Sequence, residues 1–327
     1  MILIVSSLAD AHAVSVTKKL TERGVPYYLF DTSAYPKNIQ LSFELEKQLK
    51  SISLYDMLME KSIDLTNMKV AWWRRPLPII IDEQIKDFDA IQFTCSECIA
   101  ALSGVWDSMN AYWINNPVLD EAASKKLFQL KVAAEAGFLV PRTCVTNNKQ
   151  KALCFANSLK HTKVIYKSFL ATKQAWRETR LLTQDEMDKM ENVKFAPVIF
   201  QEFIPSVLDL RITVIGNKIF CISVDSSMCG YEYDYRVHLD KAVIKSYDLP
   251  AGIQHKVLQF MNRLGLIYGA IDMRLTPGGD FYFLEINTAG EWQFLEEQTT
   301  LKITDYFVDF MIDKCFTLHS NERVLAP

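Results

Sequence analysis

The chain has 327 residues, 49% of them hydrophobic and 23% charged, the composition of an ordinary globular protein with room for two or three domains or subdomains. Its 36 basic and 39 acidic residues leave a formal net charge of −3, and no run of like charge stands out. This balance gives no electrostatic reason to expect a nucleic acid or an anionic membrane as partner. We expect the partner to be a small molecule or a peptide.

Nothing in the sequence has the pattern of an export signal or a membrane span. The first five residues are apolar, but Asp10 follows soon after and there is no basic region or cleavage site, so a buried strand is predicted rather than a signal peptide. No apolar run approaches the roughly 18 residues needed to cross a bilayer. Seven cysteines, an odd number scattered over a long chain, fit a reducing compartment. A cytoplasmic protein is expected.

The N-terminal third has the pattern of an α/β domain, assigned to residues 1–115. A strand is predicted at 2–6, a helix at 12–23 ended by Gly24, and a second strand at 27–30, which together imply a parallel sheet. Further strands are predicted at 41–45 and 70–73 and a helix over 85–105.

A break at Asn115-Asn116-Pro117 separates this domain from the rest. A central α/β subdomain is assigned to residues 116–200, and a strand-dominated C-terminal subdomain to residues 201–327. The central part is predicted to hold helices at 121–136 and 149–158 and strands at 143–146 and 164–167. The C-terminal part is predicted to hold strands at 198–203, 210–215 and 219–224, then helices at 252–264 and 303–315.

Three oxygen-bearing side chains gather in a predicted hairpin near the C-terminus. Asp272 closes one apolar segment, and Glu285 and Asn287 share one face of the next strand because side chains alternate along it. Residues 276–280, Thr-Pro-Gly-Gly-Asp, form a strong turn signal between the two strands. Two carboxylates and a carboxamide are ligands that Mg²⁺ prefers. Taken alone, the same acids also fit a solvated sheet edge, so the choice between a metal site and a solvated edge depends on other segments of the sequence.

The order of motifs resembles that of the ATP-grasp carboxylate ligases. Similarity to ribosomal-protein glutamate ligases includes three motifs: Gln-Glu-Phe-Ile at 201–204, Asp-Leu-Arg at 209–211 and Glu-Ile-Asn at 285–287. A closer resemblance is to the ATP-grasp peptide macrocyclases that mature microviridin-like graspetides, and it spans roughly residues 1–310. That resemblance is carried by Trp72-Trp73-Arg74-Arg75, Tyr233-Asp234-Tyr235-Arg236, Tyr247-Asp248-Leu249-Pro250, and the segments YGAIDM and FLEINTAGEW.

The resemblance implies an ATP-grasp fold with an N-terminal parallel-sheet pre-ATP-grasp domain, a central α/β subdomain and a mostly antiparallel C-terminal nucleotide and metal subdomain. It also assigns roles by residue. Lys126 and Lys167 would contact nucleotide phosphates, with Lys125 as an alternative to Lys126. The other implied groups are an adenine-reading strand (Gln201, Glu202, Phe203, Ile204), a ribose acid (Asp209), catalytic arginines (Arg211, Arg236 and, optionally, Arg274) and metal ligands (Asp272, Glu285, Asn287). One departure is the lack of glycine at 168–173, where many ATP-grasp enzymes carry a glycine-rich flap.

The implied activity uses ATP and Mg²⁺ to activate Asp or Glu side chains of a ribosomally made precursor peptide as acyl phosphates. Thr or Ser hydroxyls would then close ester rings and Lys amines amide rings. Two alternatives stay open: an amino-acid ligase of the same fold acting on a protein or small molecule, and a nucleotide-binding regulator without turnover. The resemblance also suggests a homodimer. Cys95 and Cys98 form a lone CxxC inside a helical pattern and are interpreted as structural thiols.

Overall fold

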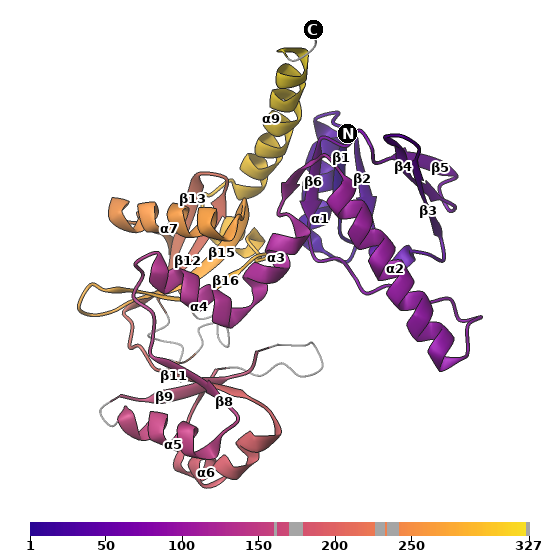
Figure 1. Ribbon diagram of the computed structural model, residues 1–327. Helices are drawn as coiled ribbons and strands as arrows, with labels where there is room; N and C mark the ends of the chain where they lie inside the picture. Colours follow the sequence, from indigo (N-terminus) through magenta and orange to yellow (C-terminus); the bar gives the residue numbers. More distant parts are fainter. Residues whose placement is uncertain (160–161, 170–178, 226–232, 234–241, 325–327) are drawn as a thin grey trace.

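The computed structural model describes residues 1–159, 162–169, 179–225, 233 and 242–324. Within these residues the strands form four sheets, one of them parallel and the others antiparallel. Figure 1 shows an N-terminal part that carries the long helix α2, a central lobe with α5 and α6, and a C-terminal sheet from which α9 projects. In the part of the chain described, no helix is long and apolar enough to span a membrane.

The N-terminal domain is built on a parallel sheet with the strand order β2-β1-β6-β7, beside which β3, β4 and β5 form a small antiparallel sheet. Asp10 caps the first helix by accepting the Ala13 amide at 2.8 Å, and Gly24 ends it with a φ of 66°. The elements are β1 (Ile2–Val5), α1 (Ala11–Glu22), β2 (Tyr27–Phe30), η1 (Thr32–Ala34), β3 (Ile39–Leu45), β4 (Leu49–Asp56), β5 (Lys61–Asp64), β6 (Val70–Trp73), α2 (Phe88–Ser108) and β7 (Tyr112–Ile114).

The central lobe is an antiparallel sheet of order β10-β9-β11-β8, covered by α5 and by the segment that follows β10. Its small core contains the fully buried Ala152 of α5 and Phe200 of β11. The elements are β8 (Thr143–Thr146), α5 (Lys149–Ser158), β9 (Val164–Lys167), β10 (Arg180–Leu181), α6 (Gln184–Asp188), η2 (Met190–Phe195) and β11 (Val198–Glu202).

The C-terminal sheet has the order β14-β13-β12-β15-β16, and its two faces differ. One face is apolar and packs under α4 and α7, with Phe138, Phe260 and Phe283 at its centre. The elements are α3 (Pro117–Ser124), α4 (Lys126–Glu135), β12 (Leu208–Ile215), β13 (Lys218–Asp225), β14 (Val243–Ser246), α7 (Ala251–Leu264), β15 (Tyr268–Leu275), β16 (Phe281–Asn287), α8 (Gln293–Gln298) and α9 (Ile303–Val324).

One hydrophobic core joins the N-terminal domain to the C-terminal part. It combines Ile2 and Trp72 of the parallel sheet with Tyr268, Trp292 and Phe307. The last helix, α9, thereby packs against α1 and β6 (Figure 1). The interface is apolar at its centre, so the N-terminal domain is placed firmly against the strands that carry the predicted site.

The predicted helix over 121–136 is wrong as a single element, because the chain forms two helices that meet at Lys125. The first begins at Pro117, where the Asn116 side chain accepts the amides of Val118 and Leu119. The break has a tertiary cause: the buried Gln129 amide nitrogen donates to the Ala123 carbonyl at 2.7 Å and to the Ile286 carbonyl at 2.9 Å. Lys126 consequently starts a second helix, which packs against β16.

The other predicted strands and helices up to residue 315 are confirmed to within a few residues, except that α9 runs on to Val324. The domain division at 115 and 200 stays a prediction. Helices α3 and α4, which belong to the subdomain assigned to residues 116–200, pack on the C-terminal sheet.

Candidate active site

The three predicted metal ligands lie on one face of the β15–β16 hairpin. Asp272 stands directly opposite Glu285, and Ala270 stands opposite Asn287 in the same ladder. Side chains that face each other across an antiparallel pair point to the same side of the sheet. Their neighbours Ile271 and Ile286 point to the other side, into the apolar core. The geometry predicted from alternation is therefore present, while the role of these oxygens as metal ligands stays a prediction.

Each of the two carboxylates in this set is held by a cation. The Arg211 Nη1 lies 3.1 Å from both Asp272 oxygens, and both side chains are buried. Lys126, at the start of α4, donates to Glu285 through its ammonium group. The negative charge of the hairpin is thus balanced by one residue from β12 and one from α4. A metal ion bound here would share these carboxylate oxygens with Arg211 and Lys126.

A second buried ion pair continues the row on the same face. The ladder between β12 and β15 places Asp209 opposite Arg274 and Arg211 opposite Asp272. The Arg274 Nε donates to Asp209 at 2.9 Å, and its Nη1 donates to the Ile204 carbonyl at 2.8 Å. Charges of opposite sign therefore alternate along both strands. Asp209, the predicted ribose acid, and Arg274, the optional catalytic arginine, are partners of each other.

The predicted adenine-reading strand connects the central lobe to the C-terminal sheet. Gln201 is buried and donates to the Thr143 hydroxyl at 2.8 Å, and Glu202 ends β11. Phe203 and Ile204 are both buried, and the Arg274 guanidinium lies 5.0 Å above the Phe203 ring. The segment is thus fixed to the ion-pair row by one arginine that contacts two consecutive residues.

Lys167 lies at the end of β9, on the central lobe. It lines a cavity of about 220 Å³ together with Tyr166, Phe169 and Arg180. The predicted Arg236 lies outside the described residues, and so does most of the glycine-free segment after Lys167. The geometry of the site therefore rests on the hairpin, on β12 and on residues 201–204.

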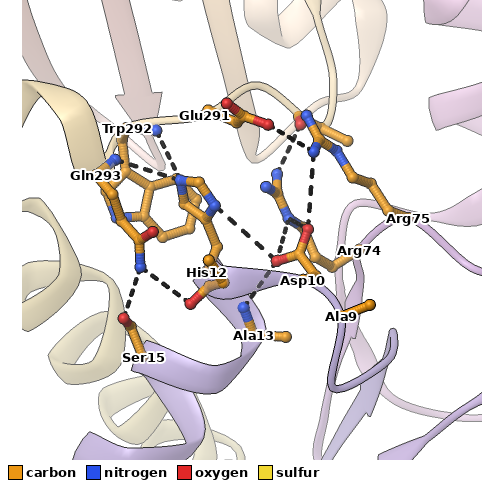
Figure 2. A network of polar contacts seen from close by, with 12 residues as sticks. Ala9, Asp10, His12, Ala13, Ser15, Arg74, Arg75, Glu291, Trp292 and Gln293 are labelled. Atoms are coloured by element: carbon orange, nitrogen blue, oxygen red, sulfur yellow. Dashed lines mark hydrogen bonds and ion pairs between the residues drawn. The ribbon is translucent and has the colours of Figure 1, made fainter. Parts of the chain in front are cut away.

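A polar network that the sequence patterns did not predict reaches the hairpin from the N-terminal domain (Figure 2). Arg74 is completely buried and donates to the backbone carbonyls of Ala289 and Gly290, just after Asn287. Its other partner is Asp10, the cap of α1, at 3.3 Å. The only sequence signal for this arrangement was the double arginine after Trp72-Trp73, which carried the family resemblance but no assigned role.

Burial and charge set the ionisation of this network. Burial by itself raises the pKa of Asp10, but the Arg74 guanidinium and the Ala13 amide outweigh it and lower that pKa. Burial, helped by the charge of Arg74, lowers the pKa of His12 to about 4. His12 is therefore neutral near pH 7, and its Nε2 accepts the amide of Trp292 at 2.9 Å.

The comparisons with known proteins agree with this architecture. The family "MvdD pre-ATP grasp domain" matches residues 1–120. The crystal structure of macrocyclase MdnC from Microcystis aeruginosa, bound with precursor peptide MdnA, is similar over 95% of this chain and 98% of that chain, with 27% identity and a TM-score of 0.83. None of the curated proteins matches the chain.

Two further solved structures extend the comparison. A ligase from Chryseobacterium gregarium, described as RiPP-associated and in complex with ADP and a leader and core peptide, covers 96% of both chains with 28% identity and a TM-score of 0.85. The match to a RimK domain ATP-grasp protein from Sphaerobacter thermophilus covers 95% of this chain and 99% of that chain, with 14% identity and a TM-score of 0.58. At that identity the match is evidence of a common fold alone.

The N-terminal parallel sheet, the antiparallel lobes and these matches define the chain as an enzyme of the ATP-grasp ligase class. Within that class, the resemblance read from the sequence is confirmed: residues 1–120 match the MvdD pre-ATP-grasp family, and nearly the whole chain is similar to solved peptide macrocyclases and to a RiPP-associated ligase.

Proposed function

We propose that this ligase closes rings in a ribosomally made precursor peptide, using ATP. The observation that carries the proposal is the placement of Asp272, Glu285 and Asn287 on one sheet face, with Arg211 and Lys126 bound to the two acids. The similarity to the precursor-bound MdnC over 95% of the chain supports the same conclusion. Activated carboxylates would come from Asp or Glu side chains of the peptide, and the nucleophiles would be Thr or Ser hydroxyls or Lys amines.

The donor set fits one Mg²⁺ ion. Two carboxylates and a carboxamide offer hard oxygens from adjacent strands, and the carboxylate oxygens already bind the cationic groups of Arg211 and Lys126. No cluster of three or more His, Cys, Asp or Glu side chains suited to a metal occurs among the described residues, so the amide of Asn287 is needed to complete this set. When bound, Mg²⁺ would offset the charge of the phosphates during phosphoryl transfer.

The side chains around the proposed metal ligands would bind the nucleotide and the transferred phosphoryl group. Lys126 and Lys167 would bind phosphate oxygens, and residues 201–204 with Asp209 would hold the nucleoside. Arg211 would face the transferred phosphoryl group, where a guanidinium neutralises charge on its equatorial oxygens. Arg236 and Arg274 are proposed as further catalytic arginines. For Arg274 the supporting observation is its bond to the Ile204 carbonyl, which joins the nucleoside strand to the ion-pair row.

The proposed reaction has two steps. A carboxylate oxygen of the peptide attacks the γ-phosphorus of ATP and ADP leaves, which gives an acyl phosphate with a good leaving group. A hydroxyl or amine of the same peptide then attacks the acyl carbon, loses its proton, and expels phosphate. Each ring therefore consumes one ATP and removes the elements of one water from the peptide. Because no covalent enzyme intermediate is needed, positioning and electrostatic stabilisation supply the rate.

The test is mass spectrometry on a short Thr-, Asp-, Glu- or Lys-rich peptide, to be sought among the reading frames that neighbour the gene of the ligase. With ATP and Mg²⁺ the peptide should lose one water for each ring. Stepwise gain of free amino-acid masses would favour the amino-acid ligase instead. A regulator without turnover would give equal and negligible ATP hydrolysis for the wild type and the Asp272→Asn variant. Asp280→Asn, in the exposed turn of the same hairpin, is the matched control.

We further propose that the ligase acts in the cytoplasm as a homodimer. The six cysteines among the described residues all carry free thiols, which suits a reducing compartment. Helix α2 leaves Phe88, Phe93 and Ile99 exposed, an apolar surface that a second copy would cover. Sedimentation should give a dimer that Phe93→Glu converts to a monomer. A monomeric wild-type protein at micromolar concentration would contradict this part of the proposal.

A further inference from the structure

The loop at residues 288–292 joins the predicted metal strand to helix α8 and is held by a residue of the N-terminal domain. Arg74 Nη1 donates to the Ala289 carbonyl at 2.6 Å and to the Gly290 carbonyl at 2.9 Å. No part of the Arg74 side chain reaches solvent, and its guanidinium lies 5.5 Å from the Trp292 ring centre. A buried charge that binds two consecutive carbonyls restricts the backbone of the loop at both peptide groups.

The start of helix α8 receives its cap from a different chain segment. Trp292, the N-cap residue, makes no side-chain capping bond of its own. Instead His12 of α1 accepts the amides of Trp292 and Gln293 with its Nε2, at 2.9 and 3.3 Å. A helix start has several amides without intrahelical partners, so an acceptor placed there fixes the first turn. The N-terminal domain therefore holds the loop and the helix that follows it.

On its other side the same loop touches the catalytic set. The Asn287 side-chain oxygen accepts the Ala289 amide at 3.0 Å, and Arg211 Nη2 lies 3.4 Å from the Glu291 carbonyl. Gly290 fits against Arg211 so closely that an added Cβ would lie 2.7 Å from its Nη2. A shift of the loop would therefore move the carboxamide of Asn287 and the guanidinium of Arg211 together.

We propose that Arg74 and His12 are positioning residues of the ligase: they hold residues 288–292 so that Asn287 and Arg211 keep the geometry needed for the metal and the phosphoryl group. This inference rests on the proposed function. It gives the N-terminal domain a part in the reaction although Arg74 and His12 are both buried. If Arg74 and His12 only held the two domains together, replacing them would lower the global stability and leave the local geometry of the loop unchanged.

Hydrogen exchange of the apo protein separates the two roles without any turnover. In Arg74→Met and His12→Leu, amide exchange in a peptide covering residues 288–293 should rise about tenfold while exchange in the core strands stays unchanged. Arg74→Lys keeps the charge but not the fork of donors, so it should behave like the methionine variant. His12→Gln retains an acceptor and should restore most of the protection.

The matched control is Arg23→Ala. Arg23 of α1 also joins the two parts of the chain, but it does so by ion pairs to Asp305 and Asp309 of α9, which lie outside the loop and the hairpin. The control should leave exchange at 288–293 as in the wild type. A second readout is binding of AMPPNP at rising Mg²⁺ concentration. Arg74→Met should need about tenfold more Mg²⁺ for half-maximal binding, with unchanged nucleotide affinity in EDTA.

Failure of the inference and failure of the proposed function give different results. If the wild type binds AMPPNP without any dependence on Mg²⁺, the proposed function fails and the inference with it. If the wild type binds as expected but Arg74→Met and His12→Leu match Arg23→Ala in both exchange and Mg²⁺ dependence, the inference alone is overturned. Local exchange and Mg²⁺ dependence that rise together, with rescue by His12→Gln, support it.

Discussion

Replacing Asp272 by Asn probes the buried ion pair at the centre of the site. Asp272 and Arg211 are each 7% exposed, and the guanidinium nitrogen is 3.1 Å from both carboxylate oxygens. The substitution keeps the size of the side chain and removes its charge, so the Arg211 charge is left without its buried counter-ion. Breaking a buried pair in this way costs about 3 to 5 kcal/mol.

The expected effect lies at the lower end of that range. The carbonyl of the introduced carboxamide still accepts one hydrogen bond from Arg211, so we expect a loss of about 3 kcal/mol. That loss lowers Tm by roughly 6 to 12 °C in a domain of about 150 to 250 residues, and the 327-residue chain should fall toward the lower end. The assay is differential scanning fluorimetry of the apo protein in EDTA, beside a ligation assay in which turnover should fall by about a hundredfold or more.

The control for this prediction is Asp280→Asn, which changes an exposed acid in the turn of the same hairpin. A surface change of that kind should stay within about 0.5 kcal/mol and leave turnover intact. If Asp272→Asn shifts Tm no more than Asp280→Asn does, the Arg211 charge is not buried against Asp272, and the charge balance described for the site is refuted.

The same contacts yield three further predictions. Lys126→Ala should lower kcat/KM for ATP by about tenfold or more, because it removes the partner of Glu285 and the proposed phosphate contact, whereas Lys125→Ala, with a 63% exposed side chain, should not; equal effects would favour the alternative lysine. The pKa of His12 is about 4 in the folded protein, against an ordinary value of 6.5, so the unfolded chain takes up the proton first as pH falls. His12 should therefore contribute a loss of stability approaching about 3 kcal/mol to thermal unfolding between pH 6.5 and 4, and His12→Gln should reduce the total loss by that amount; an unchanged slope in that variant would contradict the assignment. Gly290→Ala should destabilise the protein by about 1 to 3 kcal/mol, because the new Cβ would overlap the Ala270 Cβ. Its control is Gly278→Ala, which should be close to neutral in the same melting experiment because no atom lies nearer than 3.7 Å to the new Cβ.

The sequence predicted the hairpin because local patterns determine it. Alternation placed Glu285 and Asn287 on one face, and the turn at 276–280 brought Asp272 opposite them. The three-stranded sheet was only partly found: β3 was predicted, while β4 was missed although Ile52, Leu54 and Asp56 alternate as buried residues along it. That signal was present in the sequence and could have been used.

Other features had no local signal. The end of α3 at Lys125 depends on Gln129, whose side chain bonds to a carbonyl 157 residues away in sequence. The contact between Arg74 and the loop after Asn287 spans 215 residues. The pairing of Asp209 with Arg274 follows from strand register, which the hydrophobic pattern does not specify between strands so far apart. Tertiary contacts of this kind decide which polar groups meet, so family resemblance had to supply the candidate roles.

An acyl phosphate on the peptide is the central claim of the proposed mechanism, and isotope transfer tests it most directly. The precursor peptide is labelled with oxygen-18 in its Asp and Glu carboxylates and incubated with the ligase, ATP and Mg²⁺. The mechanism predicts one labelled oxygen in the released inorganic phosphate for every ring closed, because the carboxylate oxygen that attacks the γ-phosphorus leaves with it. Ring closure with unlabelled phosphate would contradict the mechanism.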